Sequence, residues 1–218
     1  MTELLAFDLD GTLLETAEDF FLAINTLRKR YGVTEPEISF NEVKSRVSEG
    51  AFSMAGYAMN LTLDKETEVE NYRQELMKIY KECCLVNTKP FPGIEELLNE
   101  LNSKNVYWGI VTNKPFYFAE DIVKSNLAEF NPKFLICPDD TGKRKPHPDG
   151  LNLACKTANS NPKNSFYIGD HSIDIIAGKA AGMQTVAVAY GYVPLNENLN
   201  DWDADYIVNK PSEILDLI

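Results

Sequence analysis

Apolar and polar positions change their spacing twice along the chain, and these changes divide it into three stretches. Residues 4–7 form a continuous apolar run that is long enough for one buried strand, and the polar segment DLDGT, residues 8–12, ends it. Residues 16–85 carry apolar side chains at helical spacing. Four helices are expected there, over residues 19–31, over 42–46, from residue 51 onward, and over 66–83. After residue 85, strands expected over residues 106–111, 134–137, 165–168, 185–189 and 206–208 alternate with amphipathic helices.

This alternation of strands and helices predicts an α/β fold, in which a parallel sheet carries helices on both faces. The helical block interrupts the alternation directly after the first strand, so we interpret it as an insertion. The predicted organisation is a core of residues 1–15 and 86–218 and an inserted all-helical cap domain of residues 16–85. The core is expected to end in a helix over residues 212–218.

Composition and charge limit the partners and the location of the chain. The 218 residues carry a formal net charge of -12, which disfavours a nucleic acid or an anionic membrane surface as a partner. No apolar run reaches the roughly 18 residues of a membrane span, and no basic segment leads into a long apolar stretch at the N-terminus. A cytoplasmic location is therefore expected, and four cysteines without zinc-site spacing fit free thiols there. An anionic substrate would need local cations or a metal ion.

Polar side chains follow four of the expected strands. Ligands of parallel α/β sheets bind beyond the carboxyl ends of the strands, so we expect these side chains to meet at one edge. They are Asp8, Asp10 and Thr12 after the first strand, Thr112, Asn113 and Lys114 after the second, Lys145 in a loop after the third, and Asp170 and Asp174 after the fourth. Each alone has an ordinary alternative, namely a polar turn, a helix cap or a solvated loop charge. Together they gather complementary charges in one place.

The chemistry that fits this set is phosphoryl transfer through an aspartyl phosphate. Asp8 would attack phosphorus, while Asp10 would protonate the leaving alkoxide and later deprotonate the attacking water. Lys145 would add positive charge near the phosphate, and Thr112 with the backbone N–H groups after it would contact the phosphoryl oxygens. Anionic partners repel one another, so a hard cation is needed. Mg²⁺ suits Asp8, the Asp10 carbonyl and Asp170.

Four segments of the chain resemble the four motifs of the haloacid dehalogenase superfamily. They are DLDGTLLET at residues 8–16, VTNKP at 111–115, KPHP at 145–148 and GDHSID at 169–174. The resemblance implies a Rossmann-like core, Mg²⁺ dependence and phosphatase activity. The site residues it implies are Asp8 as nucleophile, Asp10 as acid and base, Thr112 and Lys145 as phosphate-stabilising groups, Asp170 as a metal ligand, and Asp174 as a second acidic position supporting the metal site or Lys145. The chain departs from the common pattern at Glu15-Thr16, where many relatives have Asp-Ser, and at His147, where many have an acid.

The helical insertion resembles the cap of the group that contains phosphoglycolate phosphatases. Within this group, VSEG at 47–50, CPDD at 137–140 and YGY at 190–192 resemble a bacterial branch that acts on phosphoglycolate or on N-acetylmuramic acid 6-phosphate. A phosphoglycolate phosphatase-type activity is the first prediction, and N-acetylmuramic acid 6-phosphate or another sugar phosphate is the alternative substrate. Phosphoglycolate and N-acetylmuramic acid 6-phosphate both carry a carboxylate, for which Arg46 is the candidate in the cap. Glu49 and Gly50 are further substrate-binding candidates: Glu49 could accept hydrogen bonds from sugar hydroxyl groups, and Gly50 could let backbone N–H groups come close to the ligand. Thr12 and Asn113 are the substrate-binding candidates in the core.

Single residues argue against some of the other activities found in the same superfamily. Asp10 argues against a dehalogenase, because halide leaves without a proton. A phosphonate hydrolase would need a Schiff-base lysine in the cap, and Lys44 lacks the apolar setting that would lower its pKa. A phosphomutase and a non-catalytic phosphate-binding module remain open alternatives. The expected partner is a small anionic phosphate ester, and the chain is expected to be a monomer or a homodimer.

Overall fold

The structure is a computed structural model that describes residues 2–218 and divides the chain into two compact units. The core unit comprises Met1–Leu14 and Lys89–Ile218, and the helical unit comprises Glu15–Thr88. The helical unit therefore extends three residues beyond the cap boundary at residue 85 that the sequence predicted. The cause is Asp19, whose Oδ1 accepts from the backbone N–H of Asn87 at 2.8 Å and whose Oδ2 accepts from that of Thr88 at 3.0 Å.

A six-stranded parallel sheet forms the centre of the core unit. Its order is β5-β4-β1-β6-β7-β8, and each neighbouring pair is parallel. The strands are β1 (Leu4–Phe7), β4 (Trp108–Val111), β5 (Leu135–Ile136), β6 (Ser165–Gly169), β7 (Gln184–Val188) and β8 (Tyr206–Val208). All four residues of β1 are buried, as its continuous apolar run requires. The parallel α/β sheet expected from the sequence is confirmed.

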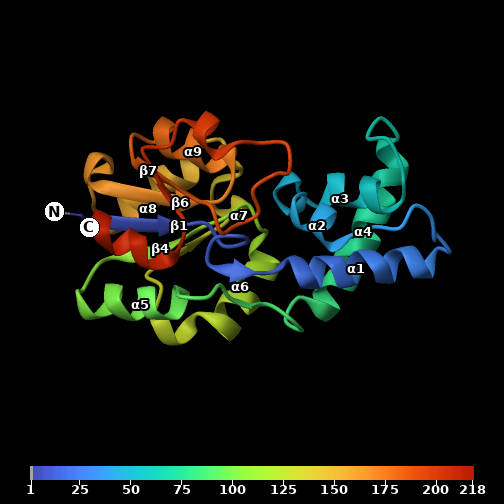
Figure 1. Cartoon of the computed structure of the whole chain (residues 1–218), viewed down its shortest axis with the longest axis horizontal. Coiled ribbons are helices and arrows are strands. Elements are labelled where there is room, and N and C mark those ends of the chain that lie inside the picture. The colour runs from blue at the N-terminus through green and yellow to red at the C-terminus, as the bar shows by residue number, and fades with distance from the viewer. Residues whose placement is uncertain (1) are drawn as a thin grey trace. The chain divides into compact units, whose positions relative to one another are not determined.

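Helices cover both faces of this sheet (Figure 1). One face carries α8 (Asp149–Ala158), which packs on β1, β4 and β5, and α9 (Ser172–Ala180), which packs on β6 and β7. Figure 1 shows α5 (Ile94–Ser103) and α6 (Phe116–Asn126) on the other side of the sheet. The remaining helical segments of the core unit are α7 (Pro138–Thr141), η2 (Ala128–Phe130), η3 (Pro162–Asn164), η4 (Leu199–Trp202) and η5 (Pro211–Leu217).

The C-terminal segment differs from the sequence prediction in its helix type. A helix was expected over residues 212–218, and the structure has the 3₁₀ helix η5 over Pro211–Leu217. The segment begins at Pro211, and Pro211 and Ile214 are its buried residues.

The chain path makes the carboxyl end of β1 the switch point of the sheet. From β1 the chain continues to β4 and β5 on one side, and it then returns to β6, β7 and β8 on the other. Phe7 is in register with Ile110 of β4 and with Ile168 of β6. The residues that follow these three strands therefore lie at the same level, where ligands bind in such sheets.

The helical unit contains four α-helices and one 3₁₀ turn in residues 15–88. They are α1 (Ala17–Arg30), α2 (Phe40–Lys44), η1 (Val47–Glu49), α3 (Ala51–Ala58) and α4 (Glu66–Cys83). Helix α2 begins two residues before the predicted start at residue 42, because Ser39 and Glu42 form a reciprocal capping box. The short strands β2 (Leu14–Glu15) and β3 (Lys89–Pro90) pair where the chain passes between the units. Among residues 2–218, no helix has the length and apolar character needed to cross a membrane.

Candidate active site

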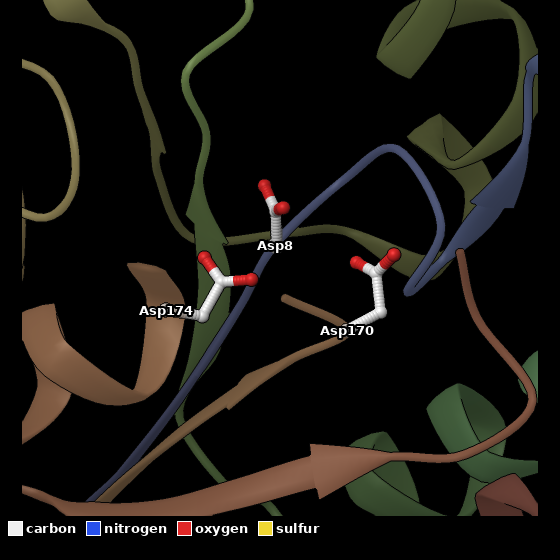
Figure 2. A group of neighbouring side chains, drawn as sticks. All are labelled: Asp8, Asp170 and Asp174. Carbon is white, nitrogen blue, oxygen red and sulfur yellow. The ribbon is translucent and has the colours of Figure 1, made fainter. Parts of the chain in front are cut away.

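Three carboxylates meet where β1 and β6 end. Asp8 follows β1, Asp170 follows β6, and Asp174 lies in the first turn of α9. One oxygen of each lies within 4.8 Å of the others, and Figure 2 shows the side chains approaching one another from these separate segments. Asp170 and Asp174 are fully buried, and Asp8 is 9% exposed. Three like charges buried this closely require compensating cations.

Two glycines leave the space that these carboxylates occupy. A Cβ atom on Gly169 would lie 2.4 Å from Asp174 Cγ, so any side chain there would displace the carboxyl group. Gly11 has a φ of 84°, which favours glycine, and a Cβ atom there would lie 2.1 Å from Asp170 Oδ2. The backbone at Gly169 and Gly11 can therefore come close to the carboxylates only because these positions have no side chain.

Asp170 is held at both of its oxygens. Thr12 Oγ1 donates to Oδ1 at 2.8 Å, and the backbone N–H of Tyr192 donates to Oδ2 at 2.8 Å. The Tyr190 hydroxyl donates to the Thr12 carbonyl at 3.2 Å, so the Tyr190-Gly191-Tyr192 segment contacts both the loop after β1 and Asp170 after β6. Because Thr12 gives its one hydroxyl hydrogen to Asp170, this predicted substrate-binding residue supports a carboxylate in the present structure.

Lys145 is the cation at the centre of the acidic cluster. Its Nζ lies 2.8 Å from Asp8 Oδ1 and 2.7 Å from Asp174 Oδ1, and its side chain is 4% exposed. It also donates a hydrogen bond to the Tyr167 hydroxyl at 2.8 Å. Buried ion pairs of this kind are strongly attractive, because little water screens them.

The backbone of Lys145 is fixed by a second residue. The Asn113 carboxamide donates from Nδ2 to the Lys145 carbonyl at 3.0 Å and accepts at Oδ1 from the Lys145 N–H at 2.7 Å. This reciprocal pair joins the loop after β4 to the loop that carries Lys145. Asn113 was predicted to bind substrate, and the structure shows its amide group engaged with Lys145 instead of pointing free.

Burial and mutual repulsion shift the pKa values in this cluster. Burial raises the pKa of Asp8 to about 6, against the opposing effect of the Lys145 charge. Burial, followed by the charges of Asp8 and Asp174, raises the pKa of Asp170 well above its ordinary value. For Lys145, burial acts to lower the pKa, but the carboxylates of Asp174 and Asp8 outweigh it and raise the value. Lys145 is therefore charged at neutral pH.

Asp10 lies in the loop after β1, two residues beyond Asp8, and pairs with a second lysine. Lys114 Nζ lies 2.9 Å from Asp10 Oδ1 and 3.1 Å from Oδ2, and the Lys114 side chain is 4% exposed. Thr112 Oγ1 accepts from the backbone N–H of Lys114 at 3.1 Å, so its own hydrogen can be donated elsewhere. The structure thus brings Asp10 and Thr112 to the predicted edge of the sheet and links them through Lys114.

The cluster fits a hard divalent cation on three grounds. Its donors are carboxylate oxygens alone, which Mg²⁺ and Ca²⁺ prefer. Asp8 Oδ1 is buried and accepts no hydrogen bond, although it faces Lys145. The four carboxylates of Asp8, Asp10, Asp170 and Asp174 also exceed the two ammonium groups that pair with them, so net negative charge remains. We conclude that the residues present suit a metal ion of this class.

The remaining predicted residues, Arg46, Glu49 and Gly50, belong to the helical unit. Arg46 Nη1 donates to Glu49 Oε1 at 3.0 Å and to Oε2 at 3.3 Å, and its Cζ lies 4.5 Å from the ring centroid of Tyr57. Ser53 Oγ donates to Glu49 as well. Gly50, with a φ of 88°, precedes the first turn of α3. These residues form a polar cluster of their own, in which the charge of Arg46 is already paired.

Sequence reasoning gave no role to three groups that the structure places in the site. The Lys114 ammonium could have been assigned, because it stands in a polar run at a strand end. The Tyr167 hydroxyl was hidden in an apolar strand, and only its residue type signals a polar group that must find a partner. The Tyr192 N–H has no signal in the sequence, because every residue except proline has one.

Known proteins resemble this chain over nearly its whole length. The family model for haloacid dehalogenase-like hydrolases matches residues 5–188. An N-acetylmuramic acid 6-phosphate phosphatase from Pseudomonas aeruginosa is 41% identical over 212 residues, which cover 97% of this chain and 92% of that protein. A phosphoglycolate phosphatase from Xanthomonas campestris pv. campestris is 34% identical over 208 residues, which cover 95% of this chain and 92% of that protein.

A solved structure extends the likeness to three dimensions. It is described as a predicted phosphoglycolate phosphatase from Haemophilus somnus, and it matches with a TM-score of 0.86 at 26% identity. The match covers 99% of this chain and 97% of the other, so the parallel-sheet core and the helical insertion both have counterparts there.

Proposed function

Because this chain belongs to the family of haloacid dehalogenase-like hydrolases, we propose that it hydrolyses a small phosphate monoester through a phosphorylated Asp8. Its enzyme class is that of a phosphoric monoester hydrolase, since the relatives matched over nearly their full length are phosphatases. The observation that carries the proposal is the meeting of a buried carboxylate, Asp8, with Lys145 at 2.8 Å and with two further buried carboxylates.

In the first step, an Asp8 oxygen forms a bond to phosphorus and the bond from phosphorus to the ester oxygen breaks. Asp10 gives its proton to the departing alkoxide, which leaves as an alcohol. The Lys145 ammonium and the Thr112 hydroxyl donate to the phosphoryl oxygens, whose charge shifts as the bonds change. Lys114 Nζ, 2.9 Å from Asp10 Oδ1, holds the Asp10 side chain in place.

In the second step, water attacks the phosphorus of the Asp8 phosphate. Asp10, now a carboxylate, takes a proton from that water, and the bond between phosphorus and the Asp8 oxygen breaks. Inorganic phosphate leaves, and Asp8 returns as a carboxylate. Asp10 thus holds its proton again at the end of the cycle, so no other acid or base is consumed.

We infer that Asp8, the Asp10 carbonyl and Asp170 would hold the metal ion. Asp174 would support the site from its position on Lys145, with both of its oxygens hydrogen-bonded or ion-paired. When bound, Mg²⁺ supplies positive charge that lets two anions approach each other. The exclusively oxygen donor set and the buried Asp8 Oδ1 without a hydrogen bond support this assignment.

The helical unit is proposed to act as the cap that selects the substrate. Arg46 is its candidate for a substrate carboxylate, and Glu49 can accept hydrogen bonds from hydroxyl groups. Phosphoglycolate is the first candidate substrate. N-acetylmuramic acid 6-phosphate is the second, and the relative at 41% identity favours it together with the Arg46–Glu49 pair, which suits a substrate that offers both a carboxylate and hydroxyl groups.

A substrate panel tests the proposed function. Phosphate release is measured from phosphoglycolate, N-acetylmuramic acid 6-phosphate, N-acetylglucosamine 6-phosphate and p-nitrophenyl phosphate, with Mg²⁺ and with EDTA. N-acetylglucosamine 6-phosphate is the matched control, because it lacks only the carboxylate-bearing ether. We expect release that requires Mg²⁺ and is not restored by Ca²⁺, whose looser geometry does not suit in-line attack. No release from any ester in the presence of Mg²⁺ would reject the proposal.

The same assay separates the two alternatives that the sequence left open. A phosphomutase would return the phosphoryl group to its organic product, whereas a phosphatase releases one inorganic phosphate for each ester consumed. A non-catalytic module would bind esters without consuming them. The cytoplasmic location and the monomeric or homodimeric state remain predictions.

A further inference from the structure

A buried tyrosine hydroxyl stands directly behind the ammonium group of Lys145. Tyr167 lies in the middle of β6, is fully buried, and is in register with Ala6 of β1. Its hydroxyl accepts a hydrogen bond from Lys145 Nζ at 2.8 Å and donates one to the Val111 carbonyl at 2.8 Å. The Asp174 Oδ1 atom, at 3.3 Å, is a more distant acceptor for the same hydroxyl hydrogen.

The three contacts of Lys145 differ in how strongly they direct the ammonium group. Its contacts with Asp8 and Asp174, at 2.8 Å and 2.7 Å, are ion pairs, and the attraction between charges depends on distance far more than on angle. Asp8 Oδ1 accepts no aligned hydrogen bond despite its short distance. The bond to Tyr167 is a hydrogen bond to a neutral oxygen, so its strength depends on direction and it restrains one N–H of the ammonium group.

The Tyr167 oxygen is itself an immobile point. Its side chain belongs to the buried core cluster that includes Ala6 of β1 and Ala177 of α9, and a Cβ atom on Gly178 would lie only 3.4 Å from Tyr167 Cβ. Its hydrogen is committed to a backbone carbonyl of β4, and burial raises the pKa of Tyr167 well above its usual range, so the hydroxyl stays protonated. The group therefore acts as a fixed acceptor that connects the end of β4 to Lys145.

We propose that Tyr167 is a positioning residue for phosphoryl transfer, which aims the Lys145 ammonium so that one of its hydrogens stays available to a phosphoryl oxygen. Lys145 is then fixed at two ends, at its backbone by Asn113 and at its Nζ by Tyr167. Without the hydroxyl, the ammonium would keep only the carboxylates of Asp8 and Asp174 as partners, at 2.8 Å and 2.7 Å, and its hydrogens would turn toward them and away from the substrate. The kinetic part of this inference rests on the proposed phosphatase function.

A double-mutant cycle tests the kinetic part. Single-turnover hydrolysis of p-nitrophenyl phosphate with Mg²⁺ is measured for the wild type, Tyr167→Phe, Lys145→Met and the double variant. We expect Tyr167→Phe to slow the reaction by about 10- to 100-fold, the range for losing a hydrogen bond to a charged group, with a KM changed by less than about threefold. In the Lys145→Met background it should change the rate by no more than about twofold. Equal factors in both backgrounds would overturn the proposal.

Tyr206→Phe is the matched control. It removes a tyrosine hydroxyl from β8, where that hydroxyl donates to Gln184 Oε1 at 3.3 Å in the same sheet. It should leave the rate and the KM unchanged, whereas a general cost of removing a sheet tyrosine hydroxyl would affect both variants.

A second measurement does not depend on activity. In ¹⁵N-labelled protein, the buried Lys145 ammonium should give its own slowly exchanging N–H signal, identified by its disappearance in Lys145→Met. Tyr167→Phe should abolish or broaden this signal, while the Lys114 ammonium, which Asp10 holds at 2.9 Å, serves as an internal reference. If Tyr167→Phe does not fold, absence of the Lys145 signal in the wild type would by itself overturn the proposal. A wild type that shows the signal and loses it in Tyr167→Phe, but releases no phosphate, would reject the proposed function and leave only the fixing of Lys145 by Tyr167 supported.

Discussion

The two units of the molecule each contain a cation paired with carboxylates, and the two cations differ in their access to water. In the core unit, the Lys145 side chain is 4% exposed, and its partners Asp8 and Asp174 are 12% and 0% exposed at their side chains. In the helical unit, the side chains of Arg46 and Glu49 are 39% and 37% exposed. Both are close ion pairs by distance, at 2.7–2.8 Å for Lys145 and at 3.0 Å for Arg46.

This difference in exposure gives the two pairs different physical properties. Removing one partner of a buried ion pair leaves an uncompensated charge, which lowers the stability of the fold by several kcal/mol. The geometry around Lys145 is therefore fixed. An exposed pair contributes at most about 1 kcal/mol, so Arg46 can leave Glu49 for another anion at little cost. This difference fits the proposal that the buried pair takes part in the chemistry and the exposed pair in substrate selection. The expected effects of substitution should therefore fall steeply from the first to the second.

The largest effect is expected at Asp8. Asp8→Asn keeps the shape of the side chain but removes the nucleophile, so turnover should fall by about 10⁴-fold or more and no phosphoenzyme should form. Both turnover and phosphoenzyme are measured by incubating the protein with ³²P-labelled substrate, quenching with acid, and counting the label released as phosphate and the label retained on the protein. Asp203→Asn, on a side chain that is 91% exposed, is the control and should retain full activity. Near wild-type turnover in Asp8→Asn would mean that another residue attacks phosphorus.

A smaller loss is expected at Asp10, and it should depend on the leaving group. Asp10→Asn removes the proton donor and the later base, which should slow hydrolysis of alkyl phosphates by about 10²- to 10⁴-fold. With p-nitrophenyl phosphate, whose leaving group needs no proton, a burst of nitrophenol should precede a slow steady state, because only the second step still needs Asp10. Stopped-flow absorbance resolves the two phases. Equal slowing of both phases would assign Asp10 to binding instead of proton transfer.

Much of the buried site could be predicted from the sequence, because its residues stand at strand ends. Asp8 and Asp170 directly follow apolar runs, and parallel strands bring their carboxyl ends to one edge. Lys145 gave a weaker signal, since it lies in a loop after α7 and not directly at a strand end. Its expected role came from its positive charge after the third expected strand and from the resemblance of the KPHP segment. The fold class was predictable as well, because short apolar runs, typical of buried strands, alternate with segments of helical spacing after residue 85.

The contacts that hold the site in place could not be predicted. Tyr167 and Lys145 are 22 residues apart, and Lys114 and Asp10 are 104 apart, so neither pairing leaves a local pattern. The helical unit also ends three residues after the predicted boundary because of a distant contact, since Asp19 accepts hydrogen bonds from the backbone N–H groups of Asn87 and Thr88. Pairings of this kind depend on how the elements pack, which hydrophobic spacing does not encode.

The pH dependence of stability tests whether the buried cluster is repulsive without metal. Burial raises the pKa of Asp8 to about 6 from an ordinary value of 3.8, so the folded protein binds this proton more tightly than the unfolded chain. In EDTA, the free energy of unfolding should therefore fall as pH rises between about 4 and 7, by about 3 kcal/mol for Asp8. Urea denaturation at several pH values measures it. Mg²⁺ should restore stability most at the higher pH, because it binds the ionised carboxylates.

Asp8→Asn supplies the control for this titration, because asparagine does not ionise. The difference in unfolding free energy between the wild type and Asp8→Asn should grow with pH in EDTA, in favour of the variant. A difference that stays constant across this range would show that Asp8 does not carry the shifted titration.

On the exposed side of the comparison, Arg46→Ala should act on substrates that carry a carboxylate. We expect kcat/KM for phosphoglycolate or N-acetylmuramic acid 6-phosphate to fall about tenfold, and for p-nitrophenyl phosphate to stay unchanged. A tenfold loss is at the lower end of the range for losing a charge-assisted hydrogen bond, because Arg46 must first leave Glu49 before it binds the substrate. Arg73→Ala is a matched control, since Arg73 pairs with Glu70 at the same spacing and with side chains 35% and 40% exposed. Equal losses on both substrate types would assign Arg46 to the fold of the helical unit.

The smallest effect is expected for Glu49→Gln, and its sign is the informative part. If Glu49 competes with a substrate carboxylate for Arg46, removing its charge should raise kcat/KM for phosphoglycolate by up to about fivefold, the upper value of an exposed pair. The gain should vanish in the Arg46→Ala background, because the guanidinium group for which Glu49 and the substrate carboxylate compete is then absent. A sugar phosphate that uses Glu49 as an acceptor for its hydroxyl groups would instead lose activity in Glu49→Gln. Steady-state kinetics on the two substrates therefore separates the competing role of Glu49 from a direct one. A loss on N-acetylmuramic acid 6-phosphate with a gain on phosphoglycolate would indicate that the exposed pair is arranged for the larger substrate.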